Sequence, residues 1–220
     1  MGLIVPVLVL GLLASLSPST IVVFILLLGT ARARVNALGF LVGWSVSLTF
    51  VFAASYLVGA SHPLEGVGGR TSVQVAQVLV GLGLLGVGLR QWWRRASALA
   101  APPPRSSATP SLGRLNPWGA AVVGVLKQPW AITAAAALVV LDHHTGLPAV
   151  VIAFVLFTAA STASVALLFL YYARQPGEAE ARLAALRVRL TEAGPALFAG
   201  VAVLAGIFLA VDGLLRLLGD

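Results

Sequence analysis

Residues 3–29 read LIVPVLVLGLLASLSPSTIVVFILLLG. The stretch is apolar over more than the ~20 residues that a bilayer-spanning helix needs, but a polar run interrupts it at residues 15–20. Within that run Pro18 has no backbone donor and crowds the carbonyl four residues earlier, so a helix kinks or breaks there. The pattern predicts a membrane-spanning helix that is broken near its midpoint.

Residues 117–141 repeat this pattern, with Lys127-Gln128-Pro129 in the middle. Pro6 precedes Pro18 by 12 positions, Pro117 precedes Pro129 by the same 12, and the two pairs are offset by 111, about half the chain. The match predicts an internal repeat. Broken helices at membrane depth free carbonyls that need internal partners or a wet cavity, which favours a substrate site over a kink that serves packing alone.

The composition supports a membrane protein. Of the 220 residues 59% are hydrophobic and 10% are charged, whereas globular domains have about 45–50% and about 25%. With a mean hydropathy of +0.99, a soluble chain could not cover its surface with polar groups. These values exclude a cytosolic enzyme, a nucleic-acid-binding module and a disordered tail, and the absence of cysteine excludes disulfides and thiol-relay chemistry.

Six stretches are long and apolar enough to span a bilayer, which predicts an all-α integral membrane protein. They cover about residues 3–29, 36–60, 73–93, 117–141, 148–172 and 194–217. Residues 94–116, rich in proline and serine, predict a flexible cytoplasmic linker between a first repeat at 1–93 and a second at 117–220. With three spans in each half, the repeats enter the membrane from opposite sides, as in many secondary transporters.

The basic residues predict the orientation. Eleven arginines fall in or beside the first, third and fifth connections, against Arg70 alone in the second and none in the fourth. By the positive-inside rule the odd connections face the cytoplasm, so both termini lie outside. The formal charge of +7 and the pI near 11.3 therefore reflect topology, and no nucleic-acid partner is expected. Arginine outnumbers lysine 13 to one, which suggests a bacterium with a GC-rich genome. The expected location is the bacterial plasma membrane.

Lys127 is the only lysine, and it lies about ten residues, or about 15 Å, into the fourth span. An intramembrane lysine costs about 2.5–3.5 kcal/mol on insertion scales and indicates a functional site. Asp212 is near the outer end of span six and is accounted for by an i,i+4 pair with Arg216. Lys127 is therefore either a neutral amine or the partner of an anionic ligand. The predicted substrate-binding residues come from the two breaks: Ser17, Pro18, Ser19, Thr20, Lys127, Gln128, Pro129 and Trp130.

Other patterns have simpler explanations. Residues 81–86 match a dinucleotide-binding fingerprint, but they lie in an apolar span with no preceding strand, so these glycines, with Gly39, Gly43 and Gly88, are expected to allow close helix packing. Asp142-His143-His144 is expected to be a solvated turn. No nucleophile, base and acid can be assembled, so no enzyme activity, cofactor or metal is expected. Hydroxyls at Ser161, Thr162 and Ser164 are expected to pack helices or to line the cavity.

Residues 177–191 predict a separate cytoplasmic element. Leu183, Leu186 and Leu190 recur at helical spacing, with charged residues such as Glu178 and Arg189 on the other side. We expect an interfacial helix that leads into the sixth span, with docking of a partner protein as the alternative.

Several short motifs carry a resemblance to a known family. Leu16-Ser17-Pro18, Ile21-Val22-Val23-Phe24, Ala31-Arg32-Ala33-Arg34 and Gly39-Phe40-Leu41-Val42-Gly43-Trp44 resemble the GAP (peptidoglycolipid-addressing, sulfolipid-addressing) proteins of actinobacteria, in the LysE transporter superfamily. The layout of six spans in two inverted halves resembles that superfamily as well. In many relatives the second motif looks like Asn-Pro-Lys, whereas here Lys127 precedes Pro129.

The resemblance implies export of a lipid or glycolipid envelope component across the plasma membrane, with that lipid and the membrane lipids as partners. Export of amino acids or other small solutes, and a non-transporting scaffold for lipid export, remain open. Formation of a homo-oligomer and association with lipid-synthesis machinery also remain open. Trp44 and Trp130 either contact the substrate or pack.

Overall fold

The computed structural model describes residues 3–61, 69–98, 115–143 and 146–219, and in these residues every regular element is an α-helix. The first half contains α1 (Ile4–Ser15), α2 (Pro18–Leu28), α3 (Ala33–Ser61) and α4 (Gly69–Ala98). The second half contains α5 (Pro117–Lys127), α6 (Trp130–Asp142), α7 (Leu147–Arg174) and α8 (Pro176–Gly219). The expected all-α class is confirmed.

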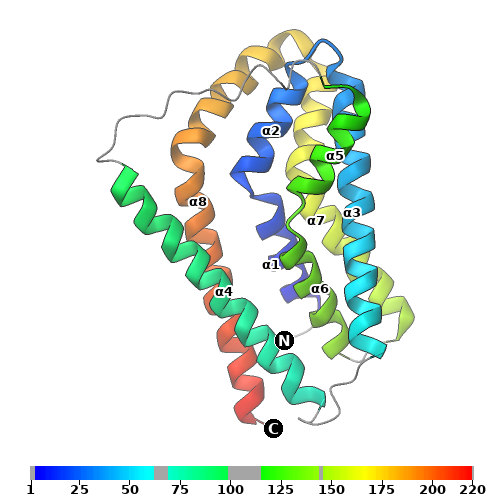
Figure 1. The fold of residues 1–220 in the computed structure, drawn as a ribbon, viewed down its shortest axis with the longest axis vertical. Coiled ribbons are helices and arrows are strands. Elements are labelled where there is room, and N and C mark those ends of the chain that lie inside the picture. Colours follow the sequence, from blue (N-terminus) through cyan, green and yellow to red (C-terminus); the bar gives the residue numbers. More distant parts are fainter. Residues whose placement is uncertain (1–2, 62–68, 99–114, 144–145, 220) are drawn as a thin grey trace.

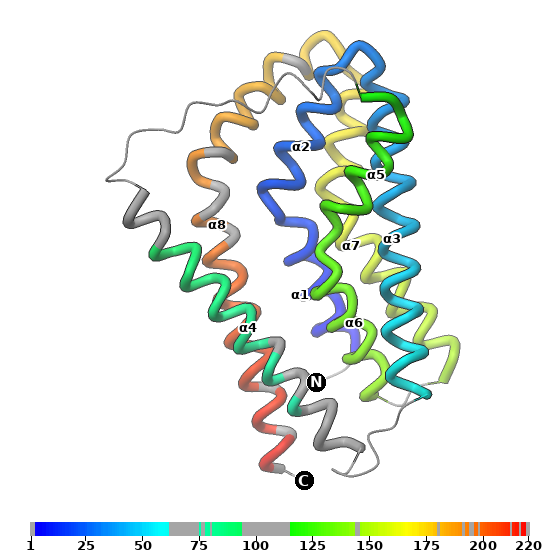
Figure 2. Tube along the Cα trace, viewed as in Figure 1, coloured from blue at the N-terminus to red at the C-terminus, as the bar shows by residue number. Residues whose placement is uncertain are grey.

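The helices form an elongated bundle (Figure 1). The start of α1 and the end of α8 lie at one end, and the starts of α3 and α5 lie at the other. The trace in Figure 2 shows α4 and α8 side by side, away from α3 and α5. Since Arg32 and Arg34 precede or begin α3, the arginine-bearing connection between α2 and α3 is at the end opposite the start of α1.

Two helices are long and apolar enough to cross a membrane, α3 with 29 residues and α7 with 28. The bent pairs α1–α2 and α5–α6 bring the number of candidate spans to four if each pair is one span. The expected spans at 73–93 and 194–217 fall on α4 and α8, where part of the side chains lie outside the described residues. The described chain thus indicates a membrane protein with two to four candidate spans.

Glycines set the packing of α5 on α3. A Cβ on Gly43 would overlap the backbone carbonyl of Ala121, and one on Gly39 would overlap that of Pro117. From the other side, a Cβ on Gly124 would overlap the Phe40 carbonyl. Only residues without side chains allow two backbones to approach this closely, as in other membrane bundles. The expected role of Gly39 and Gly43 is confirmed.

The glycines of α4 divide into two groups. A Cβ on Gly81 would lie 2.8 Å from the Gly206 carbonyl oxygen, and one on Gly206 would lie 2.7 Å from that of Gly81, so these residues form the crossing of α4 and α8. Gly88 likewise faces α8. Gly83 and Gly86 have open space around them, so the prediction that they allow close packing was wrong for this chain. They lie on a different side of α4 from Gly81.

The third connection and the start of α8 differ from expectation. Helix α4 continues to Ala98 and so includes residues assigned to the linker, whereas residues 99–114 lie outside the described residues. The interfacial helix expected at 177–191 and the segment expected to form the sixth span are parts of one helix, α8, with 44 residues. At 44 residues, α8 has more than twice the ~20 residues that a bilayer-spanning helix needs.

Candidate functional site

Both predicted helix breaks are confirmed. Helices α1 and α2 meet at 52°, and α5 and α6 meet at 59°. Pro18 is the first residue of α2, where its missing N–H costs nothing and its fixed φ suits the helix. Pro129 is the N-cap of α6, and Gln128 before it is extended, with ψ of 131°. Each proline therefore ends one helical segment and starts the next.

Side chains satisfy carbonyls that the breaks set free. Pro129 cannot donate to the carbonyl of Val125, four residues earlier, and the indole Nε1 of Trp130 donates to this carbonyl instead, at 3.1 Å. At the first break the Ser15 carbonyl accepts a hydrogen bond from Ser164 Oγ of α7, at 2.7 Å. In both cases a side chain of the protein supplies the partner that a carbonyl would need inside a membrane. The Trp130 side chain thus forms a hydrogen bond with the backbone at the second break.

The two breaks meet each other. The Thr20 hydroxyl donates to Ser17 Oγ at 3.1 Å and lies 3.4 Å from the Lys127 carbonyl oxygen, which is 107 residues away in sequence. Ser17 Oγ and Ser19 Oγ are 3.3 Å apart. Thr20 therefore lies beside the backbone of the break in the second half, and Ser17 connects Thr20 to Ser19.

The predicted site residues differ in exposure. Thr20 and Gln128 are buried, at 2% and 4% exposed, and Gln128 Nε2 donates to the hydroxyl of Thr133. The Gln128 Oε1 atom is buried without a hydrogen-bond partner among the described residues. Ser17, Pro18 and Pro129 are half-buried, whereas Ser19, Lys127 and Trp130 are exposed. A ligand would therefore meet Ser19 and Lys127 first, and Thr20 and Gln128 only after a rearrangement.

Lys127 lies at the last turn of α5 with an exposed side chain. Within the described residues its ammonium group has no hydrogen-bond or ion-pair partner. The ion pair of Glu178 with Arg182 lies on α8 and does not involve Lys127. Apolar side chains around the breaks are exposed as well: Leu12 by 52%, Leu16 by 44% and Leu126 by 66%. The polar groups of the two breaks thus lie among exposed apolar side chains.

Trp44 packs in the core. It is 1% exposed and stacks on Phe40 with ring centroids 6.0 Å apart, and Phe40 in turn meets Phe24 edge-on at 5.3 Å. Of the two explanations for Trp44, substrate contact and packing, the structure favours packing. Trp130, 50% exposed, remains accessible.

Two further residues join the halves: Asn36, which sequence reasoning did not single out, and Ser15 of the polar run at residues 15–20. Asn36 is 1% exposed, and its Nδ2 donates to Thr30 Oγ1 at 3.0 Å and to the Leu115 carbonyl at 3.1 Å. Ser15 Oγ accepts a hydrogen bond from the backbone N–H of Ser164, at 3.1 Å. A lone asparagine near the start of an apolar stretch was the available signal for Asn36. The packing role expected for Ser164 is confirmed.

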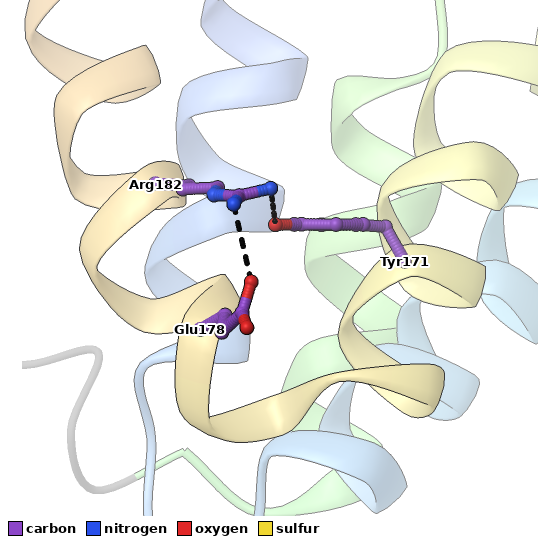
Figure 3. Close-up of polar contacts among 3 residues, drawn as sticks. All are labelled: Tyr171, Glu178 and Arg182. Atoms are coloured by element: carbon purple, nitrogen blue, oxygen red, sulfur yellow. Dashed lines mark hydrogen bonds and ion pairs between the residues drawn. The ribbon is translucent and has the colours of Figure 1, made fainter.

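The leucine side of the predicted cytoplasmic helix is covered by the protein. Leu183 is 5% exposed, and Leu186 and Leu190 pack against the core. On the exposed side Arg182 pairs with Glu178 at 3.1 Å and donates to the Tyr171 hydroxyl of α7, also at 3.1 Å (Figure 3). Docking of a partner would therefore use the charged side of α8.

His143, in the segment expected to be a solvated turn, has a local contact: its Nδ1 is 2.8 Å from the carbonyl oxygen of Val139. His144 lies outside the described residues. Among the residues that the structure does describe, no group of three or more metal-ligating side chains occurs.

Comparison with known proteins gives one match. The model of the family described as "Sap, sulfolipid-1-addressing protein" matches residues 7–215. No curated protein and no solved structure matches the chain.

Proposed function

The chain belongs to the family of Sap, the sulfolipid-1-addressing proteins, and on this basis we propose that it exports a lipid or glycolipid component of the cell envelope across the bacterial plasma membrane. The family's name concerns the addressing of a lipid, and the apolar helices fit a protein that works within the membrane. The protein itself carries out transport in this proposal.

The proposed architecture has six spans in two inverted repeats. Three features support it: each half begins with a bent helix pair, the first span of each half packs on the second span of the other, and the two third spans pack on each other. Gly11 of α1 approaches Phe157 and Ala160 of α7, as Gly43 of α3 approaches Ala121 of α5. The reciprocal contact of Gly81 and Gly206 is what a two-fold axis between α4 and α8 would produce.

The proposed substrate site is the pair of breaks. Pro18 and Pro129 open the helices, the hydroxyls of Ser17 and Ser19 and the amide of Gln128 bind polar groups, and Lys127 attracts an anionic head group. The contact of Thr20 with the Lys127 carbonyl is the observation that carries this proposal, because it brings two distant polar breaks together at the middle of the bundle. Transport then proceeds by alternating access or through a lateral gate.

The test is reconstitution. Purified protein in liposomes, with a labelled sulfated glycolipid in the inner leaflet, is expected to move the lipid to the outer leaflet, and Lys127→Met is expected to slow this movement while Lys127→Arg retains it. Transfer no faster than in protein-free liposomes would contradict the proposal and favour a scaffold.

Cells separate the remaining alternatives. Deletion of the gene followed by lipid profiling is expected to remove a surface glycolipid and to accumulate it inside. Unchanged lipids together with sensitivity to an amino acid would support the solute exporter that the resemblance to the LysE superfamily suggests.

A further inference from the structure

One row of side chains on α5 is exposed from the first turn of the helix to the break. Trp118 is 81% exposed, Val122 is 57% and Leu126 is 66%, at spacings of four residues. Beyond the break, Trp130 is 50% exposed and its indole reaches back to the Val125 carbonyl. We call Trp118, Val122 and Leu126 the α5 row.

The opposite side of α5 is fixed. Gly39, Gly43 and Gly124 bring the backbones of α3 and α5 into direct contact, so α5 cannot turn the α5 row inward without losing this packing. Residues four apart advance by about 40° around a helix of 3.6 residues per turn. The α5 row therefore winds toward the side of Lys127 as it approaches the break.

Basic groups stand at both ends of the α5 row. Exposed Arg32 and Arg34 lie at the end of the bundle where α5 begins. Asn36, in the same segment, donates a hydrogen bond to the carbonyl of Leu115, just before the start of α5. At the other end is the Lys127 ammonium, which has no partner among the described residues. A lipid-facing surface is ordinarily apolar throughout, and a cation at mid-depth is costly unless an anion accompanies it. The pattern is complementary to an amphiphile with an anionic head group and alkyl chains.

We propose that the α5 row guides an alkyl chain of an anionic amphiphile from the arginine end of the bundle to the break, where Lys127 receives the head group. This inference rests on the proposed function, because the occupant is the transported lipid. It adds the path: the lipid moves along the outer surface of α5 with its chains in the bilayer, and only its head group enters the break.

Photolabelling of the full chain tests the path without requiring transport. The purified protein is placed in phosphatidylcholine vesicles that contain phosphatidic acid with a diazirine in one alkyl chain, or phosphatidylcholine with the same chain. Trypsin cleavage after Arg114 and Lys127 releases residues 115–127, which contain the α5 row, as one peptide. Residues 35–70 contain the control surface on α3, where Val42 and Val46 are each 60% exposed.

The α5 row is expected to label about five-fold more with phosphatidic acid than with phosphatidylcholine, the factor for one basic residue at about 1 kcal/mol. Val42 and Val46 are expected to label equally with both. Lys127→Met should abolish the excess labelling of the α5 row, and Lys127→Arg should keep it. Because Lys127→Met removes the trypsin cleavage site after residue 127, the α5 row of this variant lies in a longer peptide, and fragmentation of that peptide locates the adducts. An equal ratio on both surfaces, or an excess that survives in Lys127→Met, would overturn the proposal.

The two proposals fail separately. If the anionic probe labels the α5 row in a protein that moves no lipid, the proposed export function is contradicted and the proposed binding surface is supported. If the protein transfers lipid but the α5 row shows no preference for the anionic probe, the proposed path is contradicted and the proposed export function is supported.

Discussion

Gly43→Ala tests the packing that fixes α5 and hence the second break. The added methyl would overlap the Ala121 carbonyl group, and a backbone group cannot rotate away as a flexible side chain would. Overpacking of this kind costs typically 1–3 kcal/mol, and we take about 3 because backbone is the obstacle. Replacing glycine by alanine in a helix returns about 1 kcal/mol, so the net loss is about 2 kcal/mol.

Gly86→Ala is the matched control. Gly86 is also in a helix, but a Cβ there would meet nothing within 4 Å, so only the gain of about 1 kcal/mol remains. The two variants should therefore differ by about 3 kcal/mol in stability. For a chain of this size 1 kcal/mol corresponds to about 2–4 °C, which predicts melting temperatures that differ by about 6–12 °C.

Thermal unfolding in detergent, followed by intrinsic tryptophan fluorescence, measures this difference. If Gly43→Ala melted within about 2 °C of Gly86→Ala, the backbones of α3 and α5 would not be in the contact described, since a difference of that size is under about 1 kcal/mol. Reconstituted Gly43→Ala should also lose lipid transfer, because separation of the helices displaces Lys127.

Three further predictions concern polar contacts. Thr20→Val should reduce lipid transfer and destabilise the protein by about 0.5–1.5 kcal/mol, because the hydroxyl loses its hydrogen bond to Ser17 Oγ and its contact with the part-buried Lys127 carbonyl, whereas Thr20→Ser should retain both; equal loss in both variants would point to the methyl group instead. Asn116→Ala should cost about 1 kcal/mol in thermal unfolding, because the Asn116 side chain caps α5 by accepting from a backbone N–H at 2.7 Å, and an unchanged melting temperature would argue against the cap. Tyr171→Phe removes an exposed contact with Arg182 and should change stability by less than about 1 kcal/mol; a larger loss would show that this contact anchors α8 to α7.

The sequence predicted the features that depend on local chemistry. Pro18 and Pro129 break their helices wherever they stand, because the missing donor and the crowded carbonyl are properties of the residue itself. Hydrophobic stretches of sufficient length indicated a membrane protein for the same local reason. The six spans, their orientation and the roles of the site residues stay predictions.

What each residue faces was decided by the tertiary structure. Gly81 and Gly86 look alike in sequence, yet only Gly81 meets another backbone, because neighbouring helices cover one side of α4 and not the other. Thr20 looked like a ligand-binding hydroxyl, but the fold buries it against the break of the other half, and Trp130 caps the carbonyl that Pro129 set free. Sequence fixes where backbone groups lose their helical partners, whereas the positions of helices distant in the chain determine which side chains replace them.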